Sequence, residues 1–194
     1  MGYSQTDLRL SLKVNPAITF NRFTSETDSL SFETSEDNIR PTFGLAADLG
    51  LTESYFFSTG ILYSLRNVNL TAVNESTSVS DIEKYQLEYI EIPVTLKLYT
   101  NDLGVDSKIY FQTGFMFDIL VNWKGGDNSD DLIEKLRFFD TSFYIGTGFD
   151  KQLGVSTAVF IGVYYQRGLV NLASNNPEFT LKNDLLGLDL GLRF

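Results

Sequence analysis

Cysteine and histidine are both absent from the sequence. Without cysteine the chain has no disulfide framework and no thiolate nucleophile. Without histidine it lacks the side chain that most often acts as a general base at neutral pH. Long apolar runs are also missing. The longest, Ala158 to Tyr165, contains Gly162 and falls far short of the ~20 residues of a membrane-spanning helix. A helical membrane span is therefore excluded.

Basic residues are scarce compared with acidic ones. The chain has 15 Lys and Arg against 25 Asp and Glu, a net charge of -10 and a pI near 4.4. Nucleic-acid-binding domains usually carry a basic patch, so this balance argues against nucleic acid as a partner. The length of 194 residues suits one domain. We expect residues 1–194 to form it, with residues 1–6 as a short N-terminal extension.

What the sequence does contain is strict alternation, seen most clearly from Leu186 to Phe194. Every second residue there is large and apolar, and those between are glycine or charged. A two-residue period predicts a strand with one apolar and one polar face. Segments with this period make the chain all-β, with strands expected at Asp7–Phe20, Thr42–Leu51, Ser54–Arg66, Gln86–Tyr99, Lys108–Trp123, Ser142–Lys151, Thr157–Arg167 and Asn183–Phe194.

The connections alternate between long and short. Long loops are expected at about Asn21–Pro41, Asn67–Tyr85, Asn122–Thr141 and Gly168–Lys182, and short turns at Thr52–Glu53, Thr100–Ser107 and Gln152–Ser156. This layout is typical of outer-membrane barrels, whose short turns face the periplasm. We therefore predict an eight-stranded antiparallel up-and-down transmembrane β-barrel in the bacterial outer membrane, with both termini periplasmic. No signal peptide is visible, so Met1-Gly2 is interpreted as a start that replaces a removed leader.

Alternation alone does not say which face points inward. Soluble lipid-binding barrels place the apolar face inside, and that alternative must be weighed. An eight-stranded barrel has an interior only just wide enough for side chains. The polar face of this chain is rich in glycine, alanine and serine, whereas the apolar face carries no charge. The narrow interior favours the polar face inside and the apolar face against lipid.

The inward face also carries charges of both signs, which we predict to form a paired network because an unpaired buried charge is costly. Its expected members are Arg9, Lys13, Asp48, Arg66, Glu91, Lys97, Asp118, Asp189 and Arg193. One interpretation is a structural plug that fills the barrel. The other is a narrow water-filled path lined by charge. Porins with water-filled channels use about 16–18 strands, so eight strands favour the plug.

Aromatic residues gather near the expected strand ends, where tyrosine and tryptophan favour the lipid headgroups. The expected girdle residues are Tyr55, Phe57, Tyr99, Trp123, Phe143, Tyr165 and Phe194. Pro93 lies inside an expected strand and cannot donate a ladder hydrogen bond, so we expect a β-bulge there.

Catalytic and metal-binding patterns are weak. The known enzymes among small outer-membrane barrels use a histidine, so their mechanisms are not open to this chain, although a Ser–Lys or carboxylate dyad stays formally possible. Asp127–Asp131 with Glu134 is similar to a calcium loop but lacks its spacing and central glycine. We expect a solvated acidic loop there, with loose divalent-cation binding as the alternative. No catalytic, cofactor-binding or metal residue is assigned.

Three motifs carry a family resemblance. Tyr89–Lys97, with Glu91, Ile92 and Pro93, resembles the "Y-x-E-I-P-x-x-x-K" strand of the outer-membrane β-barrel (porin-like) family abundant in Bacteroidota. Tyr164–Asn171 resembles its "Y-x-x-G-L-x-N" strand, and Leu188–Phe194 its closing strand. The match spans about Tyr85 to Phe194. The resemblance implies fold and compartment, and a terminal Phe194 that acts as the insertion signal read by the barrel-assembly machinery.

These observations predict a non-enzymatic role, structural or in surface interaction, of the small OmpA/OmpX type. The four long loops hold most of the net negative charge and are the expected contact region. A narrow pore or small-solute binder is one alternative, and a component of an envelope or secretion assembly is another. We expect a monomer without cofactors, in contact with outer-membrane lipid and lipopolysaccharide.

Overall fold

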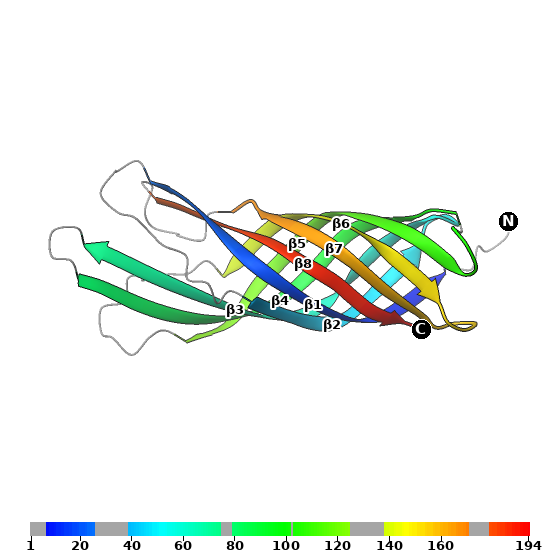
Figure 1. Cartoon of the computed structure of the whole chain (residues 1–194), viewed down its shortest axis with the longest axis horizontal. Coiled ribbons are helices and arrows are strands. Elements are labelled where there is room, and N and C mark those ends of the chain that lie inside the picture. Colours follow the sequence, from blue (N-terminus) through cyan, green and yellow to red (C-terminus); the bar gives the residue numbers. More distant parts are fainter. Residues whose placement is uncertain (1–6, 26–38, 75–78, 102, 125–137, 171–178) are drawn as a thin grey trace.

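The computed structural model of the chain is a closed antiparallel barrel of eight strands (Figure 1). The structure describes residues 7–25, 39–74, 79–101, 103–124, 138–170 and 179–194. The strands are β1 (Leu8–Ser25), β2 (Ile39–Gly50), β3 (Tyr55–Asn74), β4 (Val79–Tyr99), β5 (Ser107–Lys124), β6 (Phe139–Gln152), β7 (Ala158–Gly168) and β8 (Phe179–Arg193). No helix among the described residues is long and apolar enough to cross a membrane.

Each strand pairs with its neighbours in sequence, and β8 pairs with β1 to close the sheet. Closure leaves no edge strand around the wall, so every strand there has two partners. Phe194 continues the seam just beyond β8. Its N–H donates to the carbonyl of Leu10 at 2.9 Å, and its carbonyl accepts from the Leu10 N–H at 3.2 Å. The predicted eight-stranded up-and-down barrel is confirmed.

The two faces of the wall differ as the alternation predicts. Along β7 every second residue is exposed and those between are buried. Ile161 on the outside is 58% exposed and Leu45 is 61% exposed, whereas Lys97 inside is 3% exposed. The exposed apolar side chains of the wall therefore point outward and the buried ion-paired ones into the lumen, the reverse of a soluble protein.

Several strands extend further toward the long loops than the sequence predicts. The expected loop Asn67–Tyr85 instead contains the ends of β3 and β4, which pair from Asn67–Gln86 to Asn74–Val79. This hairpin projects beyond the rest of the barrel (Figure 1). Backbone hydrogen bonds continue the ladder beyond Leu65, where polar Asn67 and Asn69 take the alternate positions that apolar residues hold earlier in the strand, which is why the pattern placed this boundary too early.

The expected bulge at Pro93 is also wrong. The β3–β4 register is the same on both sides of Pro93, with pairs passing from Thr59–Val94 to Leu62–Glu91. The missing N–H interrupts the ladder without adding a residue. The register shift in β4 lies between Glu88 and Tyr89, against β5, near the end of the apolar belt.

Candidate functional site

The lumen holds three groups of ion pairs, arranged along the barrel from the long loops to the short turns. We name them the arginine cluster, the lysine pairs and the mouth pairs. Alternation along the strands directs all of their inward members to the same side of the wall. Outside the mouth pairs, these side chains are almost fully buried.

The lysine pairs lie in the middle of the lumen. The Lys13 ammonium lies 2.8 Å from a carboxylate oxygen of Asp189, and Lys97 lies 2.9 Å from Asp48. Each carboxylate accepts a second bond from a hydroxyl. Tyr110 donates to Asp189 at 2.8 Å, and Ser58 donates to Asp48 at 2.5 Å. Two cations and two anions cancel here, as burial requires.

The arginine cluster lies nearer the long loops. The Arg66 guanidinium bonds to Asp118 and lies 3.2 Å from Glu91 and 3.7 Å from Asp140. Arg40 pairs with Glu91. Two guanidinium groups thus face three carboxylates. Each guanidinium offers five N–H donors in a planar fork, which suits several carboxylates at once.

An aromatic ring supports the same arginine. The Arg66 guanidinium carbon lies 4.0 Å from the centroid of the Tyr89 ring. A cation stacked on a ring face gains electrostatic attraction when water is excluded. Tyr89 is 1% exposed, so this contact is shielded from water.

The mouth pairs close the lumen at the short-turn end. Arg193 makes two bonds to Asp150, at 2.8 and 3.1 Å, and a third to the Tyr99 hydroxyl at 3.1 Å. Arg9 bonds to its near neighbour Asp7 at 2.6 and 3.0 Å. The Arg9 side chain is 27% exposed, so it lies at the edge of the network rather than inside it.

Sequence reasoning missed four members of these groups, Asp7, Arg40, Asp140 and Asp150. Arg40 and Asp140 fell into the expected long loops because the strand ends were placed too early. Asp150 alternates with Gly148 on the polar face of an expected strand, so the two-residue period could have assigned it.

Inward aromatic residues are the larger surprise. Phe56, Tyr99, Tyr110 and Phe160 form one buried cluster. A second contains Tyr144 and Tyr164, whose rings stack at 5.3 Å, together with Ala17, Leu62, Met116 and Leu185. The expected girdle position of Tyr99 is therefore wrong, since it is 5% exposed and bonded to Arg193.

The other expected girdle residues behave differently. Phe57 is half-buried. The remaining five, Tyr55, Trp123, Phe143, Tyr165 and Phe194, are between 37% and 53% exposed. They point outward, away from the lumen. Exposed aromatic rings near the strand ends fit the headgroup level of a membrane.

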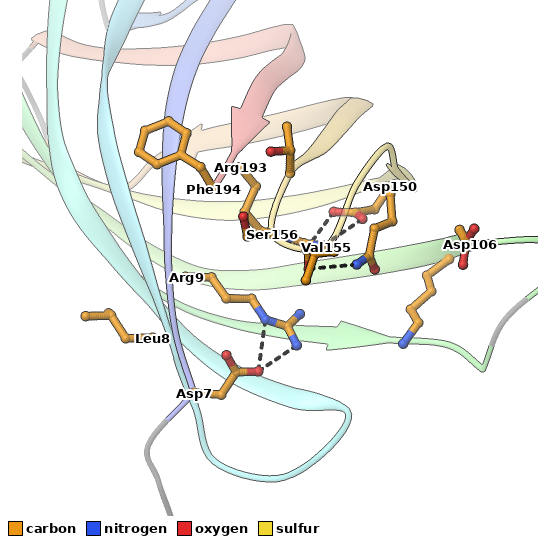
Figure 2. Close-up of a pocket in the computed structure, with 12 residues that line it drawn as sticks. Asp7, Leu8, Arg9, Asp106, Asp150, Val155, Ser156, Arg193 and Phe194 are labelled. Carbon is orange, nitrogen blue, oxygen red and sulfur yellow. Dashed lines mark hydrogen bonds and ion pairs between the residues drawn. The ribbon is translucent and has the colours of Figure 1, made fainter.

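A cavity of about 360 Å³ opens at the short-turn end beside the mouth pairs (Figure 2). Its charged lining is balanced in sign. The lining residues are Asp7, Leu8, Arg9, Asp106, Lys108, Asp150, Gln152, Val155, Ser156, Thr157, Arg193 and Phe194.

The described lumen residues give little support for a metal site or a catalytic site. No group of three or more potential metal-ligating side chains occurs among the residues that the structure describes. The expected acidic loop Asp127–Asp131 lies outside the described residues. The lumen carboxylates within the described ranges bond to lysine, arginine or hydroxyl groups, an arrangement that fits structural ion pairs.

Comparison with known families decides the identity. Residues 3–174 match the family model described as outer membrane protein beta-barrel domain. The chain belongs to this family. The match includes residues 3–80, for which the sequence motifs gave only a strand pattern. Membership places the protein in the outer membrane. The narrower link to Bacteroidota stays a prediction.

Solved structures of outer-membrane proteins share this fold. The outer membrane protein OprG from Pseudomonas aeruginosa aligns with a TM-score of 0.61 at 12% identity, over 99% of this chain and 96% of that chain. AlkL, determined in lipid bilayers, aligns with a TM-score of 0.54 at 14% identity, over 100% of this chain and 92% of that chain. No curated protein sequence matches the chain. At these identities the likeness concerns the fold alone.

Proposed function

We propose that the protein is a non-enzymatic outer-membrane barrel with a closed, ion-paired interior, which acts through its long-loop end. The burial of the lumen charges carries this proposal. Lys97 is 3% exposed, and Asp48, Asp118 and Asp189 are each 1% exposed. A water-filled channel would leave its lining side chains accessible to water, so this burial supports the plug over the conducting path.

The proposed orientation follows from the loops. The three short turns and both ends of the described chain lie at one end, and the strand ends that border the long connections lie at the other (Figure 1). In outer-membrane barrels the short turns are periplasmic and the longer loops extracellular. The projecting hairpin of β3 and β4 would then face the surroundings of the cell, which supports a surface-interaction or structural role.

The chemistry of the available side chains supports the proposed absence of enzymatic activity. The chain has no histidine, and the buried carboxylates Asp48, Asp189 and Glu91 are already paired. A carboxylate used as an acid or base needs room for a substrate within hydrogen-bond reach. None of these three lines the mouth cavity.

The proposed partners follow from the compartment. We propose a monomer in contact with outer-membrane lipid and lipopolysaccharide, assembled through the barrel-assembly machinery with Phe194 as the insertion signal. Phe194 is 53% exposed at the β8–β1 seam, where a binding protein could reach it. The net charge of -10 supports the absence of a nucleic-acid partner.

The mouth cavity is the observation that favours a second candidate function, binding of a small solute. Its lining combines cations such as Lys108 with anions such as Asp106, so a solute with both charges would fit. The cavity would serve a conducting pore only if the path continued through the lumen.

Single-channel recording separates the plug from the pore. The purified protein, inserted into planar bilayers, is expected to give no steady conductance steps. A porin recorded in a separate bilayer is the positive control. The buried aromatic clusters and ion pairs leave ions no route with a low barrier. Steady, reproducible steps would overturn the plug and support the narrow pore.

A further inference from the structure

The three short turns carry exposed aliphatic side chains at their tips. These five residues, which we name the short-turn rim, are Leu51, Leu103, Val105, Leu153 and Val155. Their exposure ranges from 61% to 102%. A single exposed aliphatic residue is ordinary, but a set spread over all three turns at one end of a molecule marks a contact surface.

The two ends of the apolar belt differ. Toward the long loops, outward polar groups interrupt it. Glu88 accepts bonds from Tyr63 at 2.8 Å and from Asn122 at 3.2 Å, and Asp184 accepts from Tyr165 at 2.9 Å.

Toward the short turns Lys151 stands at an outward strand position, but exposed apolar residues continue as far as the turn tips. Leu8, Tyr55 and Phe194 are each at least 50% exposed beside the rim. The rim is therefore continuous with the lipid-facing wall.

Backbone N–H groups of the rim have hydrogen-bond partners inside the protein. The N–H groups of Leu51, Leu103 and Leu153 donate within their own turns, to Tyr55 at 2.8 Å, Ser107 at 2.9 Å and Thr157 at 2.8 Å. Backbone groups that enter a membrane must have partners inside the protein. The N–H groups of three of the five rim residues, one in each turn, meet this condition.

The ammonium group of Lys151 is held by polar groups of the adjacent turn. Its ammonium group donates to the carbonyl of Val105 at 2.8 Å and to the hydroxyl of Ser107 at 3.2 Å. A lysine at the edge of an apolar surface can extend its stem over that surface while its ammonium reaches polar partners. Here those partners belong to the adjacent turn, so the apolar tip of that turn stays outermost.

We infer that the short-turn rim inserts into the membrane at the boundary between headgroups and acyl chains, and that its partner is the phospholipid leaflet. The insertion is shallow, because Glu53 and Asn101 are exposed in the same turns and stay at the headgroup level. The mouth cavity, bordered by Val155, then opens among headgroups rather than into free solution. Under the proposed orientation this leaflet is the inner one.

The lack of cysteine makes the test direct, since each introduced cysteine is the only labelling site. Val155→Cys, Leu103→Cys and Leu51→Cys are labelled with a polarity-sensitive fluorophore in vesicles of phosphatidylethanolamine and phosphatidylglycerol. Ile161→Cys reports the lipid-facing wall. Glu53→Cys and Ser156→Cys are matched controls, each in the same turn as a rim residue.

Labels on the rim are expected to emit at shorter wavelength than the turn controls and to lose fluorescence to brominated acyl chains, as the Ile161 label does. Emission and quenching equal to those of the Glu53 label would overturn the inference. These readouts do not depend on which side of the membrane the turns face, so they are independent of the proposed orientation.

Other occupants give different results. Only this protein and lipid are present in the vesicles, so rim labels that report water there but become protected in native membranes would indicate a protein partner. Rim labels whose shielding falls when the protein is diluted in lipid would indicate a second copy. Either result overturns lipid insertion.

Discussion

At the scale of single residues, the lumen is controlled by the cost of an unpaired charge. Lys13 and Asp189 meet at 2.8 Å deep inside the wall, and each is at most 5% exposed. The pair is neutral as a unit. Removing one partner leaves the other without compensation in a space that water barely reaches.

Asp189→Asn is therefore expected to lower the free energy of unfolding by about 3–5 kcal/mol, because Lys13 stays buried without its counter-charge. Urea unfolding in phospholipid vesicles, followed through the single tryptophan, measures it. Asp106→Asn, in an exposed turn, is the matched control and should change stability by less than about 0.5 kcal/mol. A loss for Asp189→Asn as small as that of the control would contradict the buried pair.

Alternation predicted most of the buried charged residues but could not say which of them meet. Lys97 pairs with Asp48, 49 positions away, through the curvature of the closed wall. Contacts across a lumen depend on strand tilt and register, which a two-residue period does not contain. The inward position of Tyr99 could have been predicted, since it stands two residues after Lys97 on the polar face of the same expected strand.

At the scale of strands and turns, glycine on the inner face makes room for the buried rings. An added Cβ at Gly187 of β8 would lie 2.6 Å from the Tyr164 ring, which itself stacks on Tyr144. No real Cβ contact is that short, so a side chain there would force the stacked pair to move.

Gly187→Ala is expected to cost about 1–3 kcal/mol through overpacking against Tyr164. Gly154→Ala is the control, because an added Cβ in that turn meets nothing within 4 Å. Both are compared by urea unfolding in the same vesicles. Equal stability of the two variants would show that Tyr164 does not occupy this position.

Strand existence was predictable, and strand length was not. All eight strands follow from the apolar alternation, which exists because one face of the wall meets lipid. Beyond that belt polar residues replace apolar ones at the alternate positions while backbone pairing continues, as in the hairpin from Asn67–Gln86 to Asn74–Val79. The bulge expected at Pro93 is wrong because a proline inside a strand fits two arrangements. One is a ladder that lacks one hydrogen bond, and the other is a ladder with an inserted residue; the sequence does not distinguish them.

At the scale of the whole molecule, the fold is the inverse of a soluble barrel. Outward leucines such as Leu45 are 61% exposed, whereas inward Lys97 is 3% exposed. Only a surrounding lipid phase makes this arrangement favourable, because the apolar surface is then removed from water by the membrane itself.

Leu190→Arg is expected to cost about 2–4 kcal/mol, since β8 places this residue on the lipid face near the middle of the belt. Leu169→Arg, just beyond the end of β7, is expected to cost about 0–1 kcal/mol because it lies near the interface. Reversible unfolding in vesicles measures both. The depth assignment would be wrong if the two substitutions cost the same.

The central claim is that the exposed apolar side chains contact acyl chains while ion pairs, buried apolar clusters and small residues fill the lumen. Leucine-methyl NMR of the protein in bilayers tests it with one residue type on both faces. Cross-peaks to acyl-chain protons are expected at Leu12 and Leu45, which are 47% and 61% exposed, and not at Leu62 and Leu185, which are both 2% exposed. Lipid contacts at Leu62 and Leu185, with none at Leu12 and Leu45, would contradict the account.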